Sequence, residues 1–101
     1  MHARVAMFHG ADSAGIDRAL DGWKSQIESE LESPPEGLEA ISEVMVLVDR
    51  ENGRGLGITL FDTEEGLRRG DQVLNRMSMS QGGGVRTGVE YYEVALRQAR
   101  P

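Results

Sequence analysis

The chain has 101 residues, no cysteine and a net charge of −6, which together predict one domain, residues 1–101, and exclude several kinds of site. Without cysteine the chain has no disulfide, no thiolate metal site and no cysteine nucleophile. The acidic balance argues against nucleic-acid binding, which needs a clustered basic surface. Residues 1–12 do not form a signal peptide, and no apolar run approaches the roughly 20 residues of a membrane span. We therefore expect a cytoplasmic protein that binds neither nucleic acid nor membranes.

The first third of the chain predicts a strand followed by a long amphipathic helix. Residues 3–8, ARVAMF, alternate as in a strand. Apolar residues then recur every three or four positions, which predicts a helix over about residues 14–32. Ser13 is the preferred N-cap and Asp12 the alternative. Two prolines end this helix, and residues 36–40 form a connecting loop. The apolar face of the helix consists of Ile16, Leu20, Trp23, Ile27 and Leu31.

Residues 41–61 predict a β-hairpin, because Asn52-Gly53 lies between two apolar runs. A two-residue loop at Asn52-Gly53 would place Leu47 opposite Ile58. A three-residue loop over residues 51–53, with Gly53 in a left-handed conformation, would pair the strands differently. We prefer the three-residue loop, because it gathers six aliphatic side chains on one face for the helices to cover.

The preferred register sorts the hairpin residues onto two faces. The face toward the helices would carry Val44, Val46, Val48, Leu56, Ile58 and Leu60. The opposite face would carry Met45, Leu47, Gly57, Thr59 and Phe61. This second face is apolar but mixed, which suits a cavity or a partner subunit better than bulk water.

A second helix and a last strand complete the chain. Thr63 is the predicted N-cap of a helix that runs to about Ser80, with an apolar face made of Leu67, Gly70, Val73, Leu74 and Met77. The glycines at 82–84 interrupt the chain, and Val85 to Leu96 predicts a strand. Tyr91-Tyr92 breaks its alternation, which indicates a bulge or two buried faces. Arg97 to Pro101 is a tail.

The order β-α-β-β-α-β predicts a ferredoxin-like α+β fold, a four-stranded antiparallel sheet with both helices on one face. Such a sheet leaves its second face uncovered, and here that face would be apolar. Exposed apolar patches of this kind mark an interface or a ligand groove. The simplest arrangement is a homodimer in which two copies pack sheet to sheet.

In ARVAMF, VLVDRENGRGLGITLFDTEEGLR and VEYYEVAL, the chain resembles the dimeric α+β barrel superfamily, in particular its antibiotic biosynthesis monooxygenase-like branch. The resemblance implies a dimeric barrel with a pocket between sheet and helices in each subunit. Members include cofactor-free monooxygenases that act on aromatic or quinol compounds, and haem-degrading enzymes. The histidine and tryptophan that haem-degrading members carry on the second helix are absent here, so we expect no cofactor.

The candidates for a ligand pocket are polar or aromatic residues of the strands and helices: Arg4, Phe8, His9, Trp23, Phe61, Asn75, Met77 and Tyr91. Alternatives remain for several of them. Arg4 could instead pair with Glu90 or Glu93 or point to solvent, and Trp23 could simply pack in the core. Tyr91 and Tyr92 point to opposite sides of a regular strand, so only one of them would reach the pocket.

No residue pattern marks a catalytic centre. His9 is a candidate general base or a solvated strand-end histidine. His2 and His9 lie on opposite faces of the strand, so we expect no metal site. Two functions follow: oxidation of a small aromatic or quinone-like molecule, as the resemblance implies, or a non-catalytic ligand-binding or structural dimer.

Overall fold

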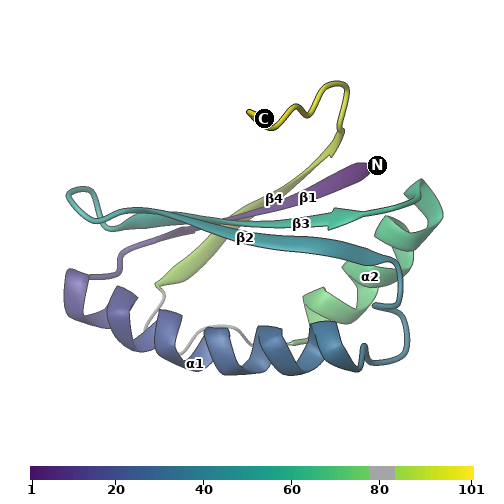
Figure 1. The fold of residues 1–101 in the computed structure, drawn as a ribbon. Coiled ribbons are helices and arrows are strands. Elements are labelled where there is room, and N and C mark those ends of the chain that lie inside the picture. Colours follow the sequence, from purple (N-terminus) through teal and green to yellow (C-terminus); the bar gives the residue numbers. More distant parts are fainter. Residues whose placement is uncertain (78–83) are drawn as a thin grey trace.

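The predicted ferredoxin-like α+β fold is confirmed (Figure 1). The structure is a computed structural model, and it describes residues 1–77 and 84–101. In chain order the elements are β1 (His2–His9), α1 (Ser13–Glu32), β2 (Ile41–Asp49), β3 (Arg54–Phe61), α2 (Glu64–Arg76) and β4 (Val85–Glu93). The four strands form one antiparallel sheet in the order β2-β3-β1-β4. Both helices lie on the same face of this sheet (Figure 1).

Helix α1 begins one residue earlier than predicted, and its N-cap is Asp12 rather than Ser13. The Asp12 carboxylate accepts a hydrogen bond from the backbone N–H of Gly15 at 2.6 Å. The Ser13 hydroxyl instead accepts a hydrogen bond from the guanidinium of Arg50 at 3.0 Å. The side chain that reaches the free amide of the first turn therefore caps the helix.

Both predicted hairpin registers are wrong, because the loop between β2 and β3 has four residues. Asp49 pairs with Arg54, and Leu47 lies opposite Leu56. The Asp49 carboxylate closes the loop by accepting hydrogen bonds from the Asn52 side-chain amide at 2.8 Å and from Arg54 Nε at 2.9 Å. Gly53 does adopt the left-handed conformation, with φ of +64°. The predicted glycine conformation thus holds in a longer loop.

The register reverses the face assignment of β3. The helix-side face of the hairpin carries Val44, Val46, Val48, Gly57, Thr59 and Phe61. The opposite face, called here the free face, carries Met45, Leu47, Leu56, Ile58 and Leu60. The three β2 valines lie toward the helices as predicted, whereas Phe61, Thr59, Ile58 and Leu60 lie on the faces opposite to those expected.

Phe61 anchors α2 to the sheet. Its side chain is completely buried, and its ring lies directly beneath Gly70 of α2. Thr63 caps this helix as predicted, since its hydroxyl accepts a hydrogen bond from the Gly66 amide at 2.9 Å. The helix ends at Arg76, because Met77 is extended, whereas the prediction continued the helix through it; the rest of the predicted continuation, residues 78–80, lies outside the described residues. Glycine at position 70 therefore lets the helix approach the sheet over an aromatic ring.

Replacing Gly70 with alanine should destabilise the protein by about 1–3 kcal/mol, although alanine is the better helix former. A Cβ at position 70 would lie less than 3.0 Å from ring carbons Cε1 and Cζ of Phe61. Gly22→Ala in α1 is the matched control, since nothing lies within 4 Å of its added Cβ. It should stabilise by up to about 1 kcal/mol. Chemical denaturation of both variants measures the difference, and equal effects would contradict this packing.

Strand β4 is regular at the two tyrosines, where a bulge was one of two expectations. The irregularity lies instead at Thr87, because Met7 pairs with Gly88 and Phe8 pairs with Arg86. Arg4 pairs with Tyr91 and Ala3 with Tyr92. The two tyrosines therefore point to opposite faces, with Tyr91 on the helix side.

The last eight residues leave the sheet at Glu93 and cross over its free face (Figure 1). Strand β4 is thus three residues shorter than predicted. The Val94 amide donates to the Met1 carbonyl at 2.9 Å, and Arg97 forms an ion pair with Glu43 of β2. Leu60 and Ala3 are buried on this face, but Met45, Leu47 and Tyr92 remain 41–52% exposed. Only part of the free face is therefore covered.

Candidate functional site

A partly open cavity of about 250 Å³ lies between the sheet, α1 and the end of α2. Its lining is mostly apolar: Ala6, Phe8, Trp23, Ile27, Ile41, Val44, Val46, Leu74 and Met77. Arg4, Thr59, Asn75, Arg86 and Glu30 supply its polar groups. A mostly apolar cavity with a few polar groups is typical of small-molecule sites.

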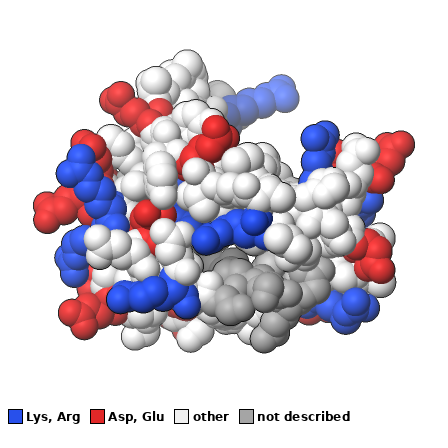
Figure 2. Space-filling model, turned by 180° about the vertical axis from the view of Figure 1, so that it is seen from behind, with Lys and Arg blue, Asp and Glu red and all other residues white. Residues whose placement is uncertain are grey.

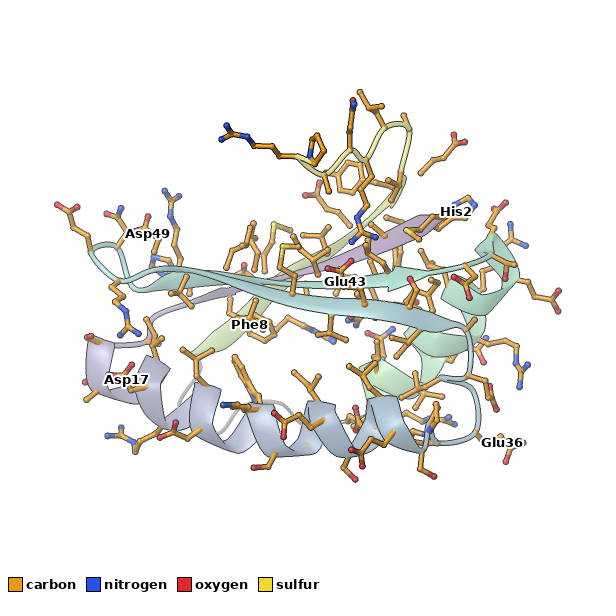
Figure 3. The ribbon with its side chains drawn as sticks, in the orientation of Figure 1. His2, Phe8, Asp17, Glu36, Glu43 and Asp49 are labelled. Carbon is orange, nitrogen blue, oxygen red and sulfur yellow. The ribbon has the colours of Figure 1, made fainter. Side chains whose placement is uncertain are left out.

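The cavity exists because α1 packs closely on the sheet only through its first half. Ile16 and Ala19 are buried, whereas Trp23 and Ile27 are partly exposed and line the cavity. Phe8 lies on the side of the sheet that faces α1 (Figure 3). The rings of Phe8 and Trp23 are tilted by 42°, with centroids 6.1 Å apart. These two rings form an aromatic wall that suits a planar ligand.

Arg4 is the buried centre of the polar end of the cavity. It is 5% exposed, and its Nε donates to the Asp71 carboxylate at 2.8 Å. Its Nη2 donates to the side-chain oxygen of Asn75 at 2.9 Å. The alternatives of a pairing with Glu90 or Glu93 and of exposure to solvent are both wrong, because Arg4 is buried and points toward α2, which carries Asp71. Asp71 provides the counter-charge that a buried guanidinium requires.

Two further residues extend this cluster. Arg86 Nη1 donates to the same oxygen of Asn75 at 3.0 Å. The Tyr91 hydroxyl lies 2.9 Å from both carboxylate oxygens of Asp71. Partial burial and the hydrogen bond to Asp71 raise the pKa of Tyr91 above its ordinary value. The phenol is therefore protonated at neutral pH and acts as the donor to Asp71.

The predicted pocket residues do not all meet at the cavity. Arg4, Phe8, Trp23, Asn75 and Met77 line it. Tyr91 does not line it; its hydroxyl binds Asp71, which in turn binds Arg4, and both Tyr91 and Asp71 line a separate pocket beside α2.

The other two candidates lie elsewhere. His9 is exposed at the end of β1 beside a separate depression at the hairpin, and Phe61 is buried under α2.

Sequence reasoning missed Asp71, Arg86 and Thr59. A signal for Asp71 existed: it lies four residues after Leu67 and four before Asn75, on the helix face that packs on the sheet. Arg86 carried no such signal, because its position depends on the irregularity at Thr87. Thr59 was assigned to the wrong face with the rest of β3.

Several observations bound the chemistry of the described residues. No group of three or more histidine, aspartate or glutamate side chains among residues 1–77 and 84–101 is arranged to hold a metal ion. None of the helices in these ranges is long and apolar enough to cross a membrane. On the face drawn in Figure 2, acidic and basic side chains are interspersed. A scan against models of protein families and a search of curated proteins each found no match for this chain.

Proposed function

We propose that the chain is a small-molecule-binding protein whose cavity between the sheet and α1 takes a planar aromatic or quinone-like ligand. The observation that carries this proposal is the cavity itself, with an aromatic wall at one side and hydrogen-bonding groups at one end. A cavity of about 150 Å³ is large enough for benzene. The volume of about 250 Å³ therefore suits a molecule of one or two rings.

Trp23 provides a direct test, because it is the only tryptophan and it lines the cavity. Titration with one- and two-ring aromatic molecules should change Trp23 fluorescence and raise the melting temperature. Val44→Phe, which fills the cavity from β2, should abolish both effects. Leu47→Phe, on the free face of the same strand, is the matched control and should leave them intact. Binding that survives Val44→Phe unchanged, or no binding by any member of the set, would refute the proposal.

The second candidate function is oxidation of the bound molecule by oxygen, as the resemblance to antibiotic biosynthesis monooxygenases suggests. One feature favours it: Arg4 and Arg86 lie beside the cavity, where positive charge stabilises a phenolate or enolate. Oxygen consumption with one- and two-ring hydroquinones tests it. Uptake that exceeds the protein-free rate and is lost in Val44→Phe would support oxidation, and its absence alongside binding leaves the non-catalytic function.

We propose that two copies pair through their free faces, as in the dimeric α+β barrels. Met45, Leu47 and Tyr92 supply exposed apolar surface there, and Leu96 on the crossing segment is 83% exposed. Light scattering at micromolar concentration should give about twice the chain mass of 11.1 kDa. Leu47→Asp should weaken the dimer, because a charge would enter the interface. A monomer for the unaltered chain would refute the pairing.

A further inference from the structure

Of the two arginines at the polar end of the cavity, Arg4 has a carboxylate partner and Arg86 has none among the described residues. Asp71 offsets Arg4 through the contact of 2.8 Å. Arg86 donates to Asn75, which is a neutral amide. The remaining carboxylate at the cavity is Glu30 of α1, whose side chain accepts a hydrogen bond from Gln26 of the same helix. At this end of the cavity, Arg86 therefore binds a neutral amide, whereas Arg4 binds a carboxylate.

The positions of the two arginines are fixed by a shared acceptor. Arg4 Nη2 and Arg86 Nη1 lie 2.9 and 3.0 Å from the same side-chain oxygen of Asn75. Two guanidinium groups on adjacent strands, β1 and β4, are therefore held together at one end of an apolar space. Guanidinium groups bind carboxylates through short, charge-assisted hydrogen bonds. Thr59 of β3 lies opposite Arg4 in the sheet register and lines the same cavity. Its hydroxyl can donate a further hydrogen bond to a carboxylate.

We propose that the ligand is an aromatic acid, whose carboxylate binds at Arg86 and Arg4 while its rings contact Phe8 and Trp23. The inference rests on the proposed function, because it names the class of molecule that enters the same cavity. Arg4 is already paired with Asp71, so Arg86 supplies the charge that distinguishes an anionic ligand from a neutral one.

The test compares two probes of nearly equal size, 2-naphthoate and the neutral 2-naphthalenemethanol, by calorimetric titration. The naphthoate should bind at least about tenfold more tightly, since a hydrogen bond between charged groups is stronger than one between neutral groups. Raising the salt concentration should weaken naphthoate binding and leave the alcohol unaffected. Arg86→Gln keeps a polar side chain and removes the charge. It should reduce naphthoate affinity by about tenfold or more without changing that of the alcohol.

Arg100→Gln is the matched control, because Arg100 belongs to the segment that crosses the free face, away from the helices (Figure 1). It should leave both affinities unchanged. Equal binding of the two probes, or an equal loss of both in Arg86→Gln, would overturn the aromatic-acid inference and leave the proposed function standing. Failure of both probes to bind the unaltered chain would overturn the inference together with the proposed function.

Discussion

Phe61→Ala should destabilise the protein by about 3–5 kcal/mol, and the loss should not depend on protein concentration. The Phe61 ring is completely buried between β3 and Gly70 of α2, so its removal leaves a cavity inside the fold of a single chain. A domain of this size has a total stability of about 5–15 kcal/mol, so the substitution removes a large share of it. Chemical denaturation over a hundredfold range of protein concentration measures both the size of the loss and its origin.

Leu47→Ala is the matched comparison for Phe61→Ala. Leu47 lies on the free face and is 45% exposed, so its loss should act mainly on the proposed pairing between copies. Its effect on melting should therefore change with protein concentration. Phe61→Leu, which removes less volume, keeps the test open if Phe61→Ala does not fold. A concentration-dependent effect at Phe61 and a concentration-independent one at Leu47 would reverse the assignment of faces.

Asp71→Ala should cost about 3 kcal/mol of stability, because it leaves the buried guanidinium of Arg4 without its counter-charge. The side chains of Arg4 and Asp71 are 6% and 19% exposed, and Asp71 also accepts a hydrogen bond from the Tyr91 hydroxyl. The free energy of unfolding from urea denaturation measures the loss. Arg68→Ala is the control, since its ion pair with Glu64 on the same helix is exposed and should contribute about 0–1 kcal/mol.

A double substitution separates the charge effect from the general cost of altering α2. Arg4→Met combined with Asp71→Leu removes both charges and fills the site with apolar groups. It should be markedly more stable than Asp71→Ala, because no unpaired charge is then buried. If the loss of unfolding free energy in the double variant equals the sum of the losses in Arg4→Met and Asp71→Leu alone, the two side chains are not energetically coupled.

The order of elements followed from local patterns. Three local patterns predicted elements close to where the structure has them: the turn at Asn52-Gly53, the N-cap at Thr63 and the apolar periodicity of α1. A β-α-β-β-α-β order restricts the sheet to few arrangements, so the ferredoxin-like topology could be predicted.

The hairpin register could not be predicted, because β2 and β3 are apolar on both faces. Alternation specifies register only where one face is polar. The deciding contacts come from the Asp49 side chain, which binds Asn52 and Arg54 and lengthens the loop by a residue over the preferred one. This interaction between the Asp49 side chain and the loop is local in sequence. The Asn-Gly pair, however, is a much stronger indicator of a short hairpin loop, and it favoured the shorter loops.

The cavity was predicted only in part for a different reason. Its aromatic wall combines Phe8 and Trp23, each recognised as a candidate from its own element. Its polar end depends on contacts between residues that are distant in the sequence. Arg4 binds Asp71, 67 positions away, and Asn75, 71 positions away. Their contact requires the exact packing of α2 on the sheet, which the close approach of Gly70 to Phe61 determines. Patterns within single elements do not contain that information.

The segment that crosses the free face has a practical consequence for how the protein is handled. The Val94 amide binds the Met1 carbonyl, and Arg97 pairs with Glu43, so both ends of the described chain lie on the surface proposed for pairing (Figure 1). An affinity tag or fluorophore fused at either end would compete with a second copy for that surface. Glu51, which is exposed, is a better attachment point, because it belongs to the loop between β2 and β3, which lies away from both ends of the chain (Figure 1). Labels placed there would report on assembly without blocking it.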